Sequence, residues 1–321
     1  MSSVVEIMKR AAQISILCRV SGNVNADMTI GQRILLKKMQ NAEGEVKPFV
    51  SARAIKHCIR EELRKRGYEI DPFQVAVVNR KPRSFDSGDP AKFVDNDLFG
   101  FMVAKEKEEL ASRRQAPVAI SYLKSLRNVP VNAELGLRAP RKPEDPPLPF
   151  EVEVAEFIGR VDCIIYDYIG VYEGTEKIGN KQATRGERFI DENERRRRLH
   201  DFLEIFLTPS YVLPRRSNSL NVPEYLAGLV ALSESGPKPV HQYLSYRLDG
   251  GALTLDDGLL AMLQERFEKW RGVRIFFIKY PEISLDSKLL ENFKKNNRSE
   301  EKLIIKPEEA VEEITNFILG G

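Results

Sequence analysis

The stretch that decides the expected fold is FVSARAIKHCIREELRKRG, residues 49–67. Ser51 is a favoured helix N-cap, and Gly67 stands where many helices end in a left-handed residue. Three apolar residues recur at helical spacing, about 100° per residue, and share one face: Ile55, Ile59 and Leu63. The pattern predicts an amphipathic helix that buries this face against a sheet.

The other side of the predicted helix carries a basic stripe, made of Arg53, Lys56, Arg60 and Arg64. Uncapped N–H groups near Ser51 would add partial positive charge at the helix start. Together these groups suit a chain of phosphates. An ordinary solvated face explains the same pattern, because Glu61 and Glu62 partly offset the charge. Periodicity alone leaves both interpretations open.

Predicted strands flank this helix. In AQISILCRVSGNVNAD, residues 12–27, apolar side chains alternate with others, as in a half-buried strand. The alternation puts Ile14, Ile16, Cys18 and Val20 on the core face, with Ser15, Leu17, Arg19 and Ser21 on the other face. VAVV, residues 75–78, is predicted to be a buried second strand. Strand, helix and strand in this order begin a ferredoxin-like unit, so we expect an α+β fold.

The composition is that of a globular protein with little net charge. Of 321 residues, 42% are hydrophobic, and 50 basic residues against 47 acidic ones give a net charge of +3. A nucleic-acid surface therefore requires charge to be segregated locally. The three cysteines, Cys18, Cys58 and Cys163, are expected to be buried free thiols of a reducing cytoplasm. With no signal-peptide or membrane-span pattern, we expect a cytoplasmic protein.

Two segments leave the predicted core. Residues 79–115 are rich in turn residues and charge and are too long for a plain connection, which indicates an inserted subdomain. Residues 130–150 hold six prolines, which exclude a core helix or a central strand. A surface loop or linker would have the same composition.

The chain is expected to return to the sheet after each segment. APVAISY, residues 116–122, predicts a strand, and residues 152–172 predict the longest strand, with an irregularity at Gly159. A helix is expected to start near Asp191. The arginines at residues 195–198 wrap round that helix, which favours solvated charge over a ligand site. Two further helices are expected, one capped by Thr254 and running through Trp270, and one starting at Glu308.

Catalytic chemistry has little support in this sequence. The three histidines, His57, His200 and His241, stand near no serine or cysteine nucleophile motif. No Cys/His pair has the spacing of zinc ligands. In GTEKIGNK, residues 174–181, the lysine comes one position late for a P-loop, and no Ser or Thr follows it. We therefore expect no catalytic residue, no metal site and no cofactor.

Four segments in order carry a resemblance to a known family. They are ISILCRVSGN, FVSARAIKHCIRE, DNDLFGFM and RQAPVAIS. This succession resembles the repeated backbone subunit of CRISPR Cascade surveillance complexes, in the family also called DevR-like or Csa/Cst-like. The resemblance covers residues 11–170 in matching order, and LPRRSNSLNVPEYLAGLVAL extends it.

The resemblance implies an RRM-like palm with inserted fingers and thumb excursions. The palm is expected to be discontinuous, at residues 1–79 and 151–321. Residues 80–127 would form a fingers-like insertion plus the returning strand, and residues 128–150 a thumb-like Pro-rich excursion. In the family, the thumb reaches over the guide RNA and onto the adjacent subunit.

The resemblance also implies a non-catalytic subunit of a type I complex. Such a subunit binds CRISPR RNA along the sugar–phosphate backbone, oligomerises head-to-tail, contacts other Cascade subunits and presents the guide for pairing with target DNA. Ser51, Arg53, Lys56 and Arg60 match the family's Ser-x-x-x-x-Lys motif, although some members have Gln where Arg53 stands. The further RNA-facing residues implied are Arg19, His57, Arg138, Arg141, Arg215, Arg216 and Asn218.

Two alternatives remain open from the sequence. A type III-like backbone subunit cleaves target RNA with a divalent ion, and Asp27 would be the acidic residue for that reaction. Its place in SGNVNAD also fits an ordinary turn residue. The second alternative is a DNA-binding autoregulator, although we find no helix-turn-helix pattern.

Overall fold

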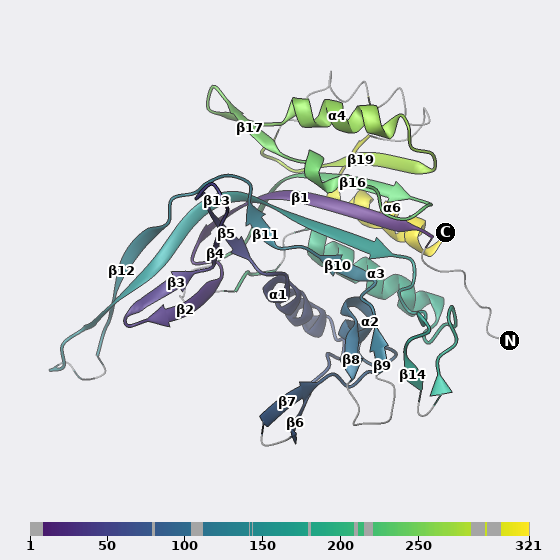
Figure 1. Ribbon diagram of the computed structural model, residues 1–321, viewed down its shortest axis with the longest axis horizontal. Helices are drawn as coiled ribbons and strands as arrows, with labels where there is room; N and C mark the ends of the chain where they lie inside the picture. Colours follow the sequence, from purple (N-terminus) through teal and green to yellow (C-terminus); the bar gives the residue numbers. More distant parts are fainter. Residues whose placement is uncertain are drawn as a thin grey trace.

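The computed structural model describes residues 9–78, 81–103, 112–140, 142, 144–178, 181–208, 211–214, 221–283, 293 and 303–320, with side chains described outside residues 74–85. Within these residues, a mixed sheet of twelve strands runs through the body of the protein (Figure 1). Its strands are β1 (Ala11–Gly22), β2 (Ala26–Ile30), β3 (Arg33–Leu36), β4 (Lys38–Gln40), β5 (Val46–Val50), β10 (Val118–Ile120), β11 (Leu123–Ser125), β12 (Asn132–Arg138), β13 (Leu148–Tyr166), β16 (Glu224–Ser233), β19 (Val273–Lys279) and β20 (Ile304–Ile305).

Helices lie on both sides of this sheet (Figure 1). They are α1 (Ala52–Lys65), α2 (Val94–Phe99), α3 (Glu192–Leu207), η1 (His241–Tyr243), α4 (Asp257–Phe267) and α6 (Pro307–Leu319). Four small hairpins complete the described chain: β6 (Gln74–Val78) with β7 (Lys81–Phe85), β8 (Phe101–Val103) with β9 (Ser112–Arg114), β14 (Lys177–Ile178) with β15 (Lys181–Gln182), and β17 (Tyr246–Asp249) with β18 (Ala252–Leu255). The predicted α+β class is confirmed. No described helix is long and apolar enough to span a bilayer.

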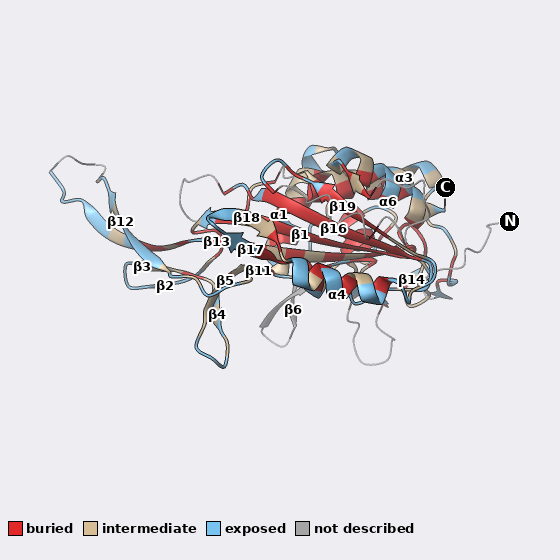
Figure 2. Cartoon of the chain, turned by 90° about the horizontal axis from the view of Figure 1, so that it is seen from above, coloured by how far each residue is buried: buried red, intermediate tan, exposed pale blue. Residues whose placement is uncertain are grey.

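The central strand β1 is buried on both faces. It pairs antiparallel with β13 on one side and β16 on the other. Ile14 and Ile16 enter the core beneath α1 and α3, whereas Leu17 enters a second core beneath α4 (Figure 2). The half-buried strand predicted from the alternation is therefore wrong, because α4 and its neighbours cover the face that carries Leu17.

The predicted partner strand at residues 75–78 is also wrong. Those residues belong to β6, which pairs with β7 in a separate hairpin. The place beside β13 is taken by β10 and β11. In chain order β1, α1, β10, β13, α3 and β16 follow one another, and their strands pair in the order β16-β1-β13-β10. Four successive apolar residues predicted a strand correctly but could not indicate its partner.

Most of the predicted helix starts are confirmed. Ser51 accepts a hydrogen bond from the Ala54 amide at 3.3 Å, and Asp191 accepts one from the Glu194 amide at 2.8 Å. Gly67, directly after the cap of α1, has a φ of +90°. The expected cap at Thr254 is wrong, since Asp256 caps α4. The three cysteines are buried free thiols, as predicted.

Gly159 serves close packing in the structure. It lies inside the continuous strand β13, where a Cβ atom would stand 2.9 Å from the Lys124 carbonyl oxygen of β11. The expected irregularity is therefore a close approach of two backbones, which a side chain would prevent.

The arginines at residues 195–198 do not share one environment. Arg195 and Arg198 are buried, at 2% and 3% exposure, so the prediction of solvated charge is wrong for these two. Arg198 Nη1 lies 3.0 Å from Asp97 Oδ2, and Arg114 Nη2 lies 2.7 Å from Asp97 Oδ1. Arg114 also binds Glu176 at 2.7 Å. This buried network joins α2, β9 and α3.

An arm projects from the sheet away from the helices (Figure 1). The first half of β13 pairs with β12, and β3 pairs with both β13 and β2. Most residues of β2 and β12 are exposed, in contrast to the buried body of the sheet (Figure 2). The Pro-rich excursion therefore includes an ordered strand, β12. Of the six prolines, four fall between β12 and β13 in the sequence, and Pro149 is the second residue of β13.

The buried network yields a stability prediction. Asp97→Ala leaves two buried guanidinium groups without their shared carboxylate, which is expected to cost about 3–5 kcal/mol. Thermal or urea unfolding, followed by circular dichroism, measures this loss. Glu61→Gln is the control, because it breaks an ion pair with Arg64 whose side chains are about half exposed, and such pairs contribute about 0–1 kcal/mol. Equal losses in the two variants would contradict the account.

Candidate nucleic-acid interface

The interface that we consider is the start of α1. Val50, at the end of β5, is fully buried, and Ile55 and Ile59 fix the helix against the sheet. The first turn of α1 contains no acidic residue. The amide groups and the dipole at this end therefore offer partial positive charge without a competing carboxylate on the same turn.

Two cations near this start have no acidic partner. Arg53 is exposed and makes no hydrogen bond or ion pair with any described residue. Lys56 is half-buried, with Nζ 5.1 Å from the centre of the Phe99 ring, and no described carboxylate pairs with it. Burial, and then the positive charge of Arg60, lower the pKa of Lys56. A half-buried ammonium group in this setting gains from an added anion.

The second half of α1 is neutralised by acidic partners. Arg60 Nε lies 2.8 Å from the buried Asp95 Oδ2, and its guanidinium carbon lies 5.1 Å from the centre of the same Phe99 ring. Arg64 pairs with Glu61, and Lys65 pairs with Glu62. The basic stripe predicted from the sequence thus divides into an open N-terminal part and a compensated C-terminal part.

His57 lies between these two parts. It is exposed and forms no ion pair with a described residue. The ion pair with Arg64, and more weakly His57, lower the pKa of Glu61.

Arg19 lies on the face of the sheet opposite to α1. It shares the side of β1 that carries Leu17, and it stands opposite Ile158 of β13. Its guanidinium pairs with Glu224 and with Glu282, and the hydrogen bond to Glu282 is the first cause of its raised pKa. Arg19 and the cations of α1 therefore lie on opposite faces of the sheet, so the expected RNA-facing residues do not form one surface.

The remaining predicted residues fall on the arm or outside the described chain. Arg138 is exposed at the end of β12. Asp27 is exposed on β2, where Lys37 Nζ lies 4.0 Å away, so it belongs to a strand and not to the turn that we expected. Four predicted residues lie outside the described residues: Arg141, Arg215, Arg216 and Asn218.

The sequence analysis missed an apolar surface on the arm. Its members are all more than half exposed and lie on β2 and β12: Met28, Ile30, Leu135 and Leu137. We call this set the arm patch. Leu135 and Leu137 alternate with other residues within NAELGLR, and this alternation predicts a strand. It was overlooked because the segment was interpreted from its prolines alone.

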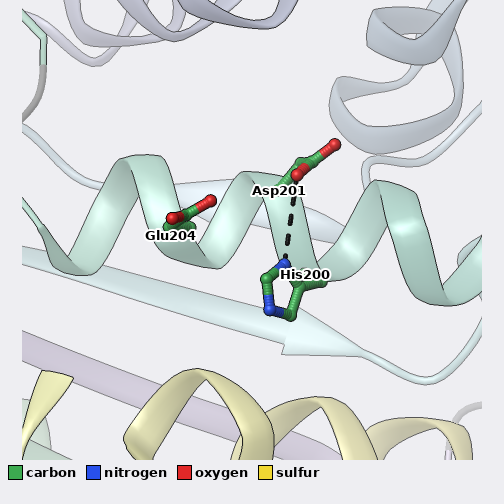
Figure 3. Close-up of side chains that lie close together, drawn as sticks. All are labelled: His200, Asp201 and Glu204. Carbon is green, nitrogen blue, oxygen red and sulfur yellow. Dashed lines mark ion pairs between the residues drawn. The ribbon is translucent and has the colours of Figure 1, made fainter. Parts of the chain in front are cut away.

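A group of possible metal ligands lies on α3, where His200 Nδ1 stands 3.9 Å from Asp201 Oδ1 and Glu204 is nearby (Figure 3). Arg66, the C-cap of α1, places Nη1 2.9 Å from Asp201 Oδ1 and also binds Glu204. Tyr68 donates to Asp201 Oδ2 at 2.6 Å. The carboxylates are thus engaged, and the group fixes the end of α1 against α3.

Comparisons with known proteins agree with this architecture. Solved structures titled "CRISPR RNA-guided surveillance complex" and "CRISPR RNA-guided surveillance complex, pre-nicking" share its fold, with TM-scores of 0.57 and 0.56 at 13% and 12% identity. Each similarity covers 95% of this chain, and 98% or 99% of the solved chain. No curated protein sequence matches the chain.

A family model matches most of the chain. Its description is "CRISPR-associated negative auto-regulator DevR/Csa2", and it matches residues 20–246. This span contains α1, the arm and the two hairpins from β6 to β9. The protein therefore belongs to the CRISPR-associated DevR/Csa2 family.

Proposed function

We propose that the protein is a non-catalytic backbone subunit of a type I CRISPR Cascade complex in the cytoplasm. It binds CRISPR RNA along the sugar–phosphate backbone, assembles head-to-tail with copies of itself and with other Cascade subunits, and presents the guide for pairing with target DNA. The observation that carries the proposal is the open cationic start of α1, formed by Arg53 and Lys56 without acidic partners. Family membership and the shared fold support it.

The chemistry of this helix start suits a phosphate backbone. The free N–H groups of the first turn and the helix dipole favour an anion, and a phosphate would supply the partner that Lys56 lacks. None of these groups is arranged to read the edge of a base. Contacts of this kind hold a strand in place irrespective of its sequence, which leaves specificity to base pairing.

The arm patch supports assembly with a second copy. Four aliphatic or thioether side chains more than half exposed on a projecting arm are costly to leave in water, and such patches mark interaction sites. An arm that contacts a different surface of the next copy makes a heterologous contact, which does not close into a dimer and can propagate along an RNA.

The first prediction concerns the phosphate grip. The double variant Arg53→Gln, Lys56→Gln should lower the slope of log affinity against log salt for single-stranded guide RNA by about 1.4, since each phosphate contact contributes about 0.7. Fluorescence anisotropy across a salt series measures the slope.

The same helix offers a matched control. Arg64→Gln, Lys65→Gln removes the same charge, but both residues are already paired with Glu61 and Glu62. This control should keep the wild-type slope. If both double variants reduce the slope equally, general charge and not the start of α1 binds the RNA.

The second prediction concerns assembly. Leu135→Asp, Leu137→Asp should prevent formation of multi-copy complexes on guide RNA, because both charges would be buried at the contact, while one copy still binds. Mass photometry of protein mixed with RNA separates these states. Leu248→Asp is the control, since Leu248 is 70% exposed on β17, away from the arm. Normal assembly of the Leu135, Leu137 variant would show that the arm patch is not the contact.

The third prediction addresses RNA cleavage. Asp27 lies near one lysine, and it belongs to no group of three or more possible metal ligands among the described residues. We expect wild type and Asp27→Ala to leave guide-paired target RNA intact in Mg²⁺, as judged on a denaturing gel. Cleavage by wild type that Asp27→Ala abolishes would replace our proposal by a ribonuclease.

The family description also names an autoregulator, which would bind duplex DNA. A mobility-shift assay with the DNA upstream of the gene, in competition with guide RNA, separates the two functions. We expect the RNA to be bound in preference.

A further inference from the structure

We propose a second contact for single-stranded nucleic acid, a base-stacking platform formed by Phe49, Tyr122 and Lys124 on the face of the sheet opposite to α1. It goes beyond the phosphate grip at the start of α1, and it can be tested separately.

Strand register places the three residues on one face. Lys124 of β11 stands directly opposite Phe49 of β5, and opposite residues of an antiparallel pair project to the same side. The neighbouring pair, Leu123 and Val50, is buried in the core beneath α1. The side chains of Phe49 and Lys124 therefore point away from α1. The Tyr122 ring joins it, with ring centroids 5.3 Å apart.

This part of the sheet face is uncovered among the described residues. The same cross-strand row continues from Lys124 through Arg160 of β13 and Leu17 of β1 to Ala227 of β16. Leu17 and Ala227 are fully buried beneath the α4 side of the molecule. Towards β11 that cover ends, and Tyr122 is 49% exposed. A tyrosine ring at this exposure is available to a ligand.

The charges of the platform favour an anion. Lys124 is exposed and has no acidic partner among the described residues. Asp162, the acid nearest along this face of β13, is occupied, since Arg160 Nε lies 3.0 Å from its Oδ1. Arg160 itself also donates to the Leu244 carbonyl. The uncompensated charge beside the rings is therefore the Lys124 ammonium group.

An exposed tyrosine ring packed on a half-buried phenylalanine, beside a lysine without a described acidic partner, suits a nucleic-acid single strand better than a protein. Every base has a π-face that stacks on an aromatic ring, and an adjacent lysine can pair with the phosphate. Lysine is depleted at the centres of protein interfaces. Phe49 also stands two residues before the cap Ser51, about 7 Å of chain, so a strand held at α1 lies within reach.

The test compares two probes on the full-length protein. One is a fluorescein-labelled oligouridine of about 15 nucleotides, a length within the usual single-strand site sizes, and the other is an abasic ribose-phosphate strand of the same length. Tyr122→Ala should weaken binding of oligouridine by about 5- to 100-fold and leave the abasic strand unaffected. Tyr122→Phe keeps the ring and should bind both strands as the wild type does.

Further variants separate stacking from other losses. Tyr122→Leu retains apolar contact with Phe49 but lacks a π-face, so it should lose affinity for oligouridine and keep its affinity for the abasic strand, even if the alanine variant is poorly folded. Lys124→Gln should lower the salt slope by about 0.7 for both strands. Arg53→Gln, Lys56→Gln should weaken both strands alike. If it does not while Tyr122→Leu still loses oligouridine, the α1 grip fails and the platform stands.

Three results would overturn the platform. Tyr122→Leu could bind oligouridine as tightly as wild type, or Tyr122→Phe could lose as much affinity as Tyr122→Leu. Tyr122→Leu could also lose both strands equally, which would point to a fold defect or a phosphate effect. If Tyr122→Leu leaves both strands unaffected but abolishes self-association in sedimentation, the surface is a contact between copies.

Discussion

The burial of β1 on both faces is the constraint on which the rest of the structure depends. Ile14 and Ile16 lie in the core beneath α1, while Leu17 lies in the core beneath α4. Neither face at the centre of the sheet can then bind a ligand. Among the described residues, the surfaces that we propose for ligand contacts are the start of α1, the arm, and the strands β5 and β11.

Charge compensation decides which of the many cations can act. The chain has almost as many acidic as basic residues, and most described arginines meet a carboxylate. Buried pairs such as Arg114 with Asp97 hold elements together and are not available to an RNA. Arg53, Lys56 and Lys124 differ because no described acid pairs with them. The cations available to bind RNA are therefore identified by their lack of an acidic partner. The net charge of the chain does not identify them.

Local features of the sequence were predictable, and distant pairings were not. Ser51, Gly67 and the apolar face of α1 follow from capping chemistry and helical period, which depend on neighbours within a few residues. Arg19 pairs with Glu282 across 263 positions, and Arg198 with Asp97 across 101. The periodicity of a single sequence does not indicate which distant residues will pair. The arm patch was missed for another reason. The prolines of residues 130–150 were taken to exclude a central strand, and the alternation of Leu135 and Leu137 between them was not considered.

The most direct measurement of the central claim is hydrogen exchange of the protein with and without bound guide RNA. The first turn of α1 has N–H groups without intrahelical partners, so a phosphate held there should slow exchange in peptides covering residues 51–57. Peptides covering residues 60–66, where the cations are already paired, should change little. Protection confined to the C-terminal half of α1, or absent from the helix, would contradict the account.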